Sequence, residues 1–332
     1  MRRLFISDLH LNSRDLYDRG FAWFRPQHHL GRILSYLRQQ ALESPTHLDE
    51  LVFLGDTFDT WLAPMDEAPP SYAEILASNE DFVQFVNQMT ARGTRVVITP
   101  GNHDFDLDEG ALGAAMPQVV IAPFVHVKHV LYATHGHELT FFNTTSHDPI
   151  EGRPIGYYFG RLTEERLPDG HSPAAVWRYI KAGALDAFFE PGMMGHIAST
   201  IFYKVAGLTP GDVFVLENGR TQTAAEVVEA YMNVAQDWSS AQRLWRLLQR
   251  PTNLHATAWK LASDHHVPLV ILGHCHHAHF TRMGPVLYAN PGAWCQDRTH
   301  AVEVLTQGAS AWVSLHEVTQ DGTSSVVRSR RV

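Results

Sequence analysis

The stretch Leu51-Val52-Phe53-Leu54-Gly55-Asp56-Thr57-Phe58-Asp59 decides the fold. Four consecutive apolar residues predict a short strand buried in a parallel sheet. The glycine allows close approach of the backbone directly after the strand, and Asp56 follows it. Open α/β sheets place their ligands outside the carboxyl ends of their strands. This stretch therefore predicts an α/β fold with an acidic side chain at the edge of the sheet that forms the site.

Four other short motifs repeat this pattern of polar residues directly after an apolar run. They are Ser7-Asp8-Leu9-His10, Gly101-Asn102-His103-Asp104, His135-Gly136-His137 and Gly273-His274-Cys275-His276. The runs before them predict strands over residues 4–6, 96–99, 125–134 and 269–272. Apolar residues at helical spacing predict helices over about 27–42 and 72–92. Alternation of strands and helices predicts parallel pairing, with the motifs gathered at one edge.

The last part of the chain predicts strands without helices between them. Residues 286–289, 301–305 and 311–315 look like antiparallel closing strands, and the basic residues 328–331 like a solvated terminus. We expect a four-layer α-β-β-α sandwich. Periodicity alone does not separate this fold from a simple doubly wound sheet, so that alternative stays open.

A long stretch without motif residues lies between the fourth and fifth motifs. We predict a catalytic domain over 1–140 and 265–332, and a mainly helical insertion over 141–264, with helices near 172–188, 223–236, 239–249 and 252–264. Such a segment is too long for a simple connection. Its apolar residues are interpreted mostly as an auxiliary core, and some of them as a substrate groove under a lid.

Composition restricts the class of protein. The 332 residues are 45% hydrophobic and 18% charged, which indicates a folded core. A net charge of −9 argues against a nucleic-acid partner. Two cysteines provide no disulfide framework, and no secretory or membrane-spanning run is present. We therefore expect a cytoplasmic protein, with peripheral membrane contact left open and the oligomeric state undetermined.

The motif residues offer the donor set expected of a catalytic dinuclear metal centre: two aspartates, an asparagine and several histidines, with both His135 and His137 available in the fourth motif. Such donors suit Mn, Fe or Zn, and two ions about 3.5–4 Å apart activate water and neutralise phosphate charge. Each motif has an ordinary alternative: a helix N-cap for Asp56, a turn for Gly-Asn and a His-rich surface loop for 274–277. Together, in strand-end context, they favour the metal centre.

All five motifs, in this order, resemble those of the calcineurin-like metallophosphoesterase family. The resemblance covers roughly residues 1–140 and 265–318 and implies the α-β-β-α sandwich. It implies one ion held by Asp8, His10, Asp56 and His276, and a second held by Asp56, Asn102, His135 and His274. Asp56 would bridge the ions, and His103, oriented by Asp59, would act as general acid. His135 is preferred to His137 as the ligand, and Asp104 is interpreted as structural.

The resemblance implies a dinuclear metal-dependent phosphoesterase that hydrolyses a phosphomonoester or phosphodiester by attack of metal-bound hydroxide. Manganese is the preferred metal, with iron or zinc as alternatives. The partner is a phosphate-ester substrate, for which an apolar moiety is left open. The segments 7–11 and 55–61 are also similar to UDP-2,3-diacylglucosamine pyrophosphatases. Those enzymes typically carry Arg where this chain has His103, and their insertion is shorter. An inactive metal-binding scaffold is a further alternative, although every ligand position is filled.

Overall fold

The structure of this chain is a computed structural model, which describes residues 1–140, 142–143, 153–162, 192–217, 219–234, 254–308 and 310–332. The chain forms two compact units. The first unit comprises Met1–Asp59, Tyr72–Gly136 and Thr252–Val332, and the second unit comprises Thr60–Ser71 and His137–Pro251. The chain therefore leaves the first unit twice and returns to it twice.

The larger sheet of the first unit carries the first three motifs. Its strands are β1 (Arg2–Ile6), β2 (Glu50–Leu54), β3 (Arg95–Thr99), β4 (Val120–Ile121), β12 (Thr299–Gln307), β13 (Ser310–Val318) and β14 (Ser324–Arg331). Their order, over the described residues, is β14-β13-β12-β1-β2-β3-β4. Strands β1 to β4 are parallel, and β12 to β14 are antiparallel to their neighbours. β1, β2 and β3 therefore end at the same edge.

The smaller sheet carries the other two motifs. Its strands are β5 (Val125–Val127), β6 (Leu131–Thr134), β9 (Leu269–Leu272), β10 (Ala278–Met283) and β11 (Val286–Pro291). In the part of the chain that the structure describes, their order is β10-β11-β9-β6-β5. β6, β9 and β11 are parallel, whereas β5 and β10 run antiparallel at the edges. β6 and β9 thus end at one edge.

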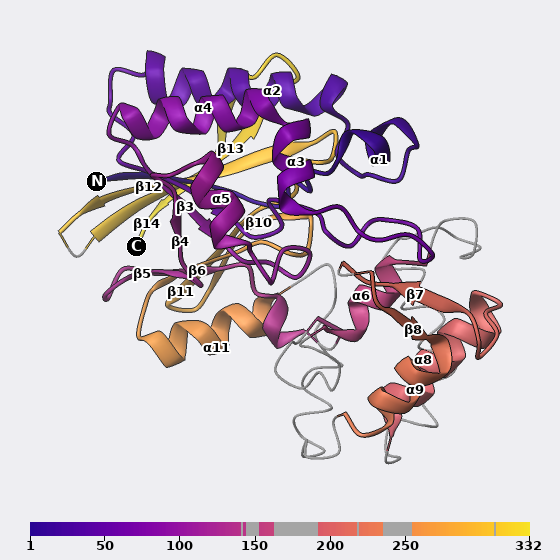
Figure 1. Cartoon of the computed structure of the whole chain (residues 1–332). Helices are drawn as coiled ribbons and strands as arrows, with labels where there is room; N and C mark the ends of the chain where they lie inside the picture. Colours follow the sequence, from indigo (N-terminus) through magenta and orange to yellow (C-terminus); the bar gives the residue numbers. More distant parts are fainter. Residues whose placement is uncertain (141, 144–152, 163–191, 218, 235–253, 309) are drawn as a thin grey trace. The chain divides into compact units, whose positions relative to one another are not determined.

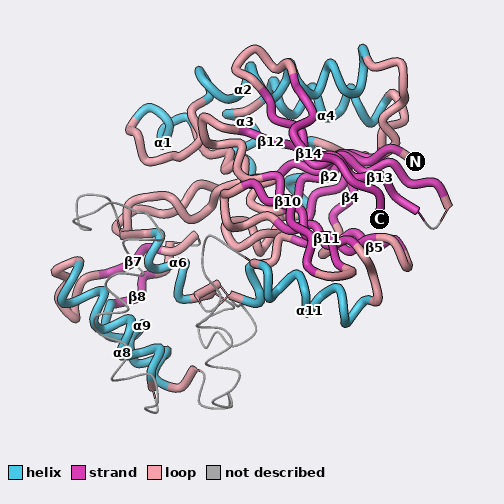
Figure 2. Tube along the Cα trace, turned by 180° about the vertical axis from the view of Figure 1, so that it is seen from behind, coloured by secondary structure: helices cyan, strands magenta, loops and turns pink. Residues whose placement is uncertain are grey.

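The helices of the first unit complete a four-layer α-β-β-α sandwich, as predicted (Figure 1). They are α1 (Arg14–Asp18), α2 (Pro26–Arg38), the π-helix η1 (Gln39–Glu43), α3 (Tyr72–Ser78), α4 (Glu80–Ala91), α5 (Glu109–Ala115) and α11 (His255–His265). Side chains alternate along β2, so Phe53 packs on Phe82 of α4 while Val52 joins the core between the sheets. α11 covers the outer face of the smaller sheet, and Figure 2 shows the same layers from behind.

Several elements differ from the prediction. The strand predicted over 125–134 is the hairpin β5–β6, which turns at His129 with a φ of 62°. The helix predicted over 72–92 is broken at Asn79, whose amide donates to the carbonyls of Ile75 and Asn12. The local hydrogen bond to Ile75 competes with the helical ones, and the other ties Asn79 to the distant Asn12.

One prediction for the C-terminal part was wrong. β11 was expected to be antiparallel, but it pairs in parallel with β9 and is antiparallel to β10 only. The basic residues 328–331 are exposed, as expected of a solvated terminus, and their backbone belongs to the edge strand β14, which was not predicted. Most side chains of β14 are exposed, so the alternation that usually reveals a strand was missing.

The second unit contains short elements around a small apolar core. They are η2 (His137–Leu139), α6 (Ile155–Gly160), α8 (Met193–Ser199), the π-helix η3 (Thr200–Val205), the strand pair β7 (Val213–Val215) and β8 (Thr221–Thr223), and α9 (Ala224–Met232). Apolar side chains of 193–202 are buried, for example Met193, Ile197 and Phe202. Of the helices predicted over 141–264, the one near 223–236 corresponds to α9, and the one near 252–264 corresponds to α11 of the first unit. Those near 172–188 and 239–249 lie outside the described residues.

Arg161 organises the interior of the second unit. Its fully buried guanidinium donates five hydrogen bonds. The acceptors are the carbonyls of Ala63, Pro64, Glu67 and Val215 and the hydroxyl of Tyr157. Because an arginine side chain has five N–H donors, its capacity is used completely. Across both units, none of the helices that the structure describes combines the length and apolar character needed to cross a membrane.

Candidate metal centre

All five motifs directly follow strands of the first unit. Asp8 follows β1, Asp56 follows β2 and Asn102 follows β3, whereas His135 and His274 follow β6 and β9 of the other sheet. Backbone hydrogen bonds join the first two loops: the N–H of Asp8 donates to Gly55 at 3.2 Å, and that of His10 to Asp56 at 2.9 Å. Parallel pairing thus brings distant motifs to one place, as the sequence predicted.

The backbone of these loops is strained at the candidate ligands. Seven non-glycine residues have a positive φ in the described part of the chain. Five of them are candidate metal ligands: Asp8 (57°), His10 (54°), Asp56 (49°), His274 (68°) and His276 (56°). Left-handed conformations cost non-glycine residues free energy, and they cluster at functional sites. Because five of the seven residues are candidate ligands, the placement of their side chains is favoured over an unstrained backbone in these loops.

Asp8, His10, Asp56 and His276 form the first group of donors. Their donor atoms all lie within 4.8 Å of one another. His276 Nε2 lies 3.3 Å from Asp8 Oδ1 and 3.2 Å from His10 Nε2, and Asp56 Oδ2 lies 3.7 Å from His10 Nε2. Asp8 Oδ1 is buried and accepts no hydrogen bond from the described residues. A buried carboxylate oxygen in this situation is costly unless a cation binds it.

Asp56, His135 and His274 form the second group. His135 Nε2 lies 3.2 Å from Asp56 Oδ2 and 3.2 Å from the side-chain oxygen of Asn102. His135 Nδ1 is 2.9 Å from the carbonyl of Leu54, which fixes the ring and turns Nε2 toward the group. Neither group contains His137. Asp56 Oδ2 is shared by the two groups, which is the position a bridging carboxylate needs.

Asp59 connects two imidazoles. Its Oδ1 lies 3.0 Å from His103 Nδ1, and its Oδ2 lies 2.9 Å from His10 Nδ1. Sequence reasoning paired Asp59 with His103 only, because the link to His10 depends on the fold. Burial opposes ionisation of Asp59, but the neighbouring His103 and His10 lower its pKa. Burial would lower the pKa of His103, but the Asp59 and Asp56 carboxylates raise it.

Asp104 holds the loops after β2 and β3 together. Its buried carboxylate accepts hydrogen bonds from the N–H groups of Asp56, Thr57, Phe58 and Gly101, at 2.6–3.1 Å. A carboxylate has about four acceptor positions, so its capacity is also used completely. Burial, and then the Asp56 charge, raises the pKa of Asp104 to about 7, against the effect of these donors. Sequence reasoning interpreted this residue as structural, without identifying its partners.

Glycines allow the loops to approach one another. A Cβ on Gly101 would lie 2.2 Å from Asp56 Oδ1, and one on Gly55 would lie 2.4 Å from the His135 ring. Both distances are impossible for real atoms. The glycine in each of these motifs is therefore required by the packing of candidate ligands.

Two residues beside the centre were missed by the sequence analysis. The Trp23 ring contacts the rings of His10, His103 and His276, with centroid distances of 4.8, 5.4 and 5.5 Å. Cys295 Sγ groups with His10 and His276. Trp23 lies between α1 and α2 and Cys295 follows β11, so neither belongs to a metal-binding motif that could have drawn attention to it.

The donors fit divalent cations. Burial lowers the pKa of His10 and, with the nearby His135, lowers the pKa of His274 to about 3, so both rings are neutral as metal ligands must be. Burial alone would lower the pKa of His135, but Asp56 raises it to about 9. A proton on His135 therefore offsets the carboxylate charge, and a bound cation would take over that role.

Comparisons with known proteins agree with this geometry at the level of the family. The family model for calcineurin-like phosphoesterases matches residues 1–278. A search of curated proteins finds no match. Among solved structures, a single mutant of Vps29 from Entamoeba histolytica shares 11% identity with a TM-score of 0.34, covering 100% of this chain and 98% of that one.

Two further structures are similar to a comparable extent. A protein from Streptococcus pneumoniae, described as a predicted phosphoesterase, shares 10% identity with a TM-score of 0.35, covering 100% of this chain and 97% of that one. A cold-active protein-tyrosine phosphatase of Shewanella shares 12% identity with a TM-score of 0.35, covering 98% and 80%. These TM-scores are too low to carry an argument. The family model, which spans most of the chain and all five motifs, shows that this chain belongs to the calcineurin-like phosphoesterase family.

Proposed function

We propose that this chain hydrolyses phosphate monoesters or diesters with two divalent metal ions. One observation carries the proposal: Asp56 Oδ2 lies between two groups of donors, 3.7 Å from His10 Nε2 and 3.2 Å from His135 Nε2. Asp8, His10, Asp56 and His276 would hold one ion, and Asp56, Asn102, His135 and His274 the other. Two such ions supply an activated water at neutral pH and offset the charge of the phosphate.

The chain's own residues would handle the leaving group. Asp59 engages Nδ1 of His103, so Nε2 is the nitrogen that would donate a proton to the leaving oxygen. Because the nearby carboxylates raise the pKa of His103 against the effect of burial, the ring would carry that proton near neutral pH. Asp59 also orients His10, so one carboxylate would position both a metal ligand and the general acid.

The class of phosphate ester that is hydrolysed depends on the residues of the second unit. The similarity of 7–11 and 55–61 to the UDP-2,3-diacylglucosamine pyrophosphatases suggested a lipid substrate, with apolar residues of the insertion as an acyl groove. In the second unit, however, Met193, Met194, Ile197, Ile201 and Phe202 are at most 3% exposed. Among the described residues these side chains act as a core. We therefore propose a general phosphoesterase rather than a hydrolase of a lipid precursor.

Substitution of the bridging carboxylate Asp56 and of the general acid His103 tests the proposal. Asp56→Asn should remove both metal ions and abolish turnover, because the shared oxygen loses its charge. His103→Asn should keep both ions and lower kcat by about 10²–10⁴-fold. Metal content by mass spectrometry is compared with turnover of p-nitrophenyl phosphate and bis-p-nitrophenyl phosphate. The matched control is His129→Asn, which changes a histidine of positive φ in the β5–β6 turn.

The outcomes separate the two roles. Wild-type metal content in Asp56→Asn would refute the bridging role. Loss of metal in His103→Asn would show that His103 is a ligand, not a general acid. Metal-loaded wild-type protein that turns over neither ester would favour the inactive scaffold.

A further inference from the structure

Cys295 lies in a loop that is fixed to the first donor group. This loop follows β11. The backbone N–H groups of Trp294 and Cys295 both donate to the carbonyl of Asp8, at 3.0 and 3.3 Å. On the other side, the Arg32 guanidinium donates to the carbonyls of Gln296 and Asp297 at 2.5 and 2.7 Å. The position of the cysteine relative to Asp8 is therefore set by the backbone.

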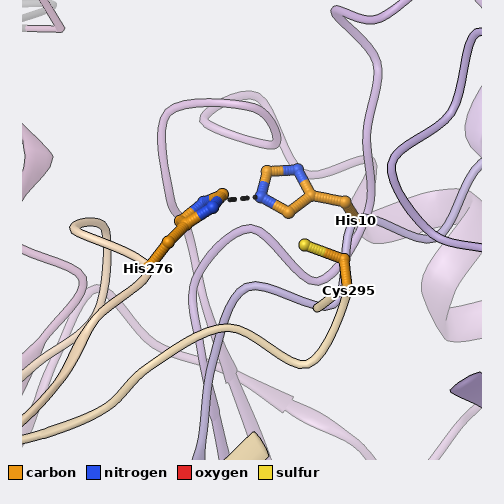
Figure 3. A group of neighbouring side chains, drawn as sticks. All are labelled: His10, His276 and Cys295. Carbon is orange, nitrogen blue, oxygen red and sulfur yellow. Dashed lines mark hydrogen bonds between the residues drawn. The ribbon is translucent and has the colours of Figure 1, made fainter. Parts of the chain in front are cut away.

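The Cys295 side chain points toward two candidate ligands. Figure 3 shows Sγ directed at the rings of His10 and His276, which face each other. The three donor atoms all lie within 4.8 Å of one another. Zinc binds sulfur at about 2.3 Å and imidazole nitrogen at about 2.0–2.1 Å, so donors at these separations can share one ion with small adjustments. Asp8 Oδ1, which is buried and accepts no hydrogen bond from the described residues, lies 3.3 Å from Nε2 of His276, one of these three donors.

Cys275 provides a contrast within the same chain. It is also buried, but its sulfur accepts a hydrogen bond from Asn290 at 3.2 Å and lies 4.0 Å from the Tyr288 hydroxyl. It belongs to the apolar cluster between the smaller sheet and α11. The candidate metal groups of the described residues do not include it. The two cysteines thus differ in what their sulfur atoms face.

We propose that Cys295 Sγ is an additional ligand of the ion held by Asp8, His10, Asp56 and His276, and that it biases this position toward zinc or iron over manganese. Thiolates select softer metals than carboxylates do, and the thiol proton is released when the metal binds. The other position, with oxygen and imidazole donors only, has no such bias. The inference rests on the metal centre proposed above.

Cobalt substitution tests the assignment directly. Metal-free protein is loaded with Co²⁺ and its absorption spectrum is recorded for wild type, Cys295→Ser and Cys275→Ser. A cobalt–thiolate bond produces an intense charge-transfer band in the near ultraviolet, which oxygen and nitrogen ligands do not. Wild type and Cys275→Ser should show this band, and Cys295→Ser should lose it while still binding cobalt. In competition, Cys295→Ser should shift the bound Zn:Mn ratio toward manganese by about tenfold.

The results distinguish this inference from the proposed function. Cobalt binding in wild type without the charge-transfer band would overturn the role of Cys295 and leave the dinuclear centre intact. A band that persists in Cys295→Ser, or that disappears in Cys275→Ser, would also overturn it. No cobalt binding in wild type would overturn both proposals. An unchanged Zn:Mn ratio in Cys295→Ser would refute the metal bias.

Discussion

Asp104 in the first unit and Arg161 in the second both provide hydrogen bonds to buried backbone groups. Asp104 accepts hydrogen bonds and Arg161 donates them. Each is fully buried, and each gathers backbone groups from loops. Asp104 accepts four N–H groups, and Arg161 donates to four carbonyls and one hydroxyl. Buried backbone groups without partners are costly. The sign of each charge matches the backbone groups that its loops leave unpaired.

The two residues differ in whether the loops they join carry candidate metal ligands. Asp104 joins the loops of two metal motifs, and the N–H of Asp56 is one of its partners. Arg161 joins the segment 63–67 to α6 and β7, which carry no candidate metal ligand. Loss of Asp104 should therefore affect stability and metal binding together. Loss of Arg161 should affect the stability of the second unit only.

The largest expected effect is that of Asp104→Asn. The amide places donors against two of the four N–H groups, so the free energy of unfolding should fall by about 4 kcal/mol. Because Asp56 moves with its loop, metal affinity should fall about 10–100-fold. Chemical denaturation and metal titration measure the two effects. The control is Asp108→Asn, at the exposed N-cap of α5, where asparagine caps equally well. Unchanged metal affinity in Asp104→Asn would break the comparison.

Arg161→Met should have a smaller effect of another kind. It removes all five donors, and the carbonyls left behind should lower the stability of the second unit by about 3 kcal/mol. Metal content and turnover of p-nitrophenyl phosphate should stay within about twofold of wild type. Limited proteolysis with mass spectrometry locates the destabilised segment. Arg153→Met, which removes an ion pair with Glu217 in the same unit, should cost less. Metal loss in Arg161→Met as large as in Asp104→Asn would contradict the contrast.

The smallest expected effect is on the pH dependence of stability, and it comes from His29, a neutral hydrogen-bond acceptor. His29 Nδ1 accepts the N–H of Arg25 at the start of α2, at 3.0 Å. Burial, and then the charge of Arg32, lowers the pKa of His29 to about 4. An unfolded histidine titrates near 6.5, so between these values the unfolded chain binds more protons. Stability should therefore fall by about 1–2 kcal/mol as the pH decreases from about 6.5 to 4.

His29→Gln should remove this part of the pH dependence, which is followed by urea denaturation across the range. His28→Gln, one position earlier and exposed, is the matched control. An equal slope in wild type and His29→Gln would show that the acceptor does not titrate. Of the buried side chains that bond to backbone groups, only Asp104 and Arg161 would then show the expected effects.

The parts of the molecule that could be predicted are those that depend on residues close together in the sequence. An apolar run and the motif directly after it indicate a strand and a candidate metal ligand at its end, as for Leu54 and Asp56. The hairpin at His129 and the edge strand β14 lack such a local pattern. Contacts between distant residues were also hidden: Asp104 lies 47 residues from Thr57, and Cys295 reaches His10 from another strand end. Their roles depend on packing rather than on spacing.

Arg161 has a further consequence for biosynthesis. Its partners Ala63 and Pro64 precede it by 98 and 97 residues. At about 5–20 residues per second, translation reaches Arg161 roughly 5–20 s after these carbonyls are made. During that interval β3 is also made and can pair with β2, while the carbonyls of Ala63 and Pro64 remain hydrated. The interior of the second unit can therefore close only once Arg161 has been made, almost a hundred residues after these carbonyls.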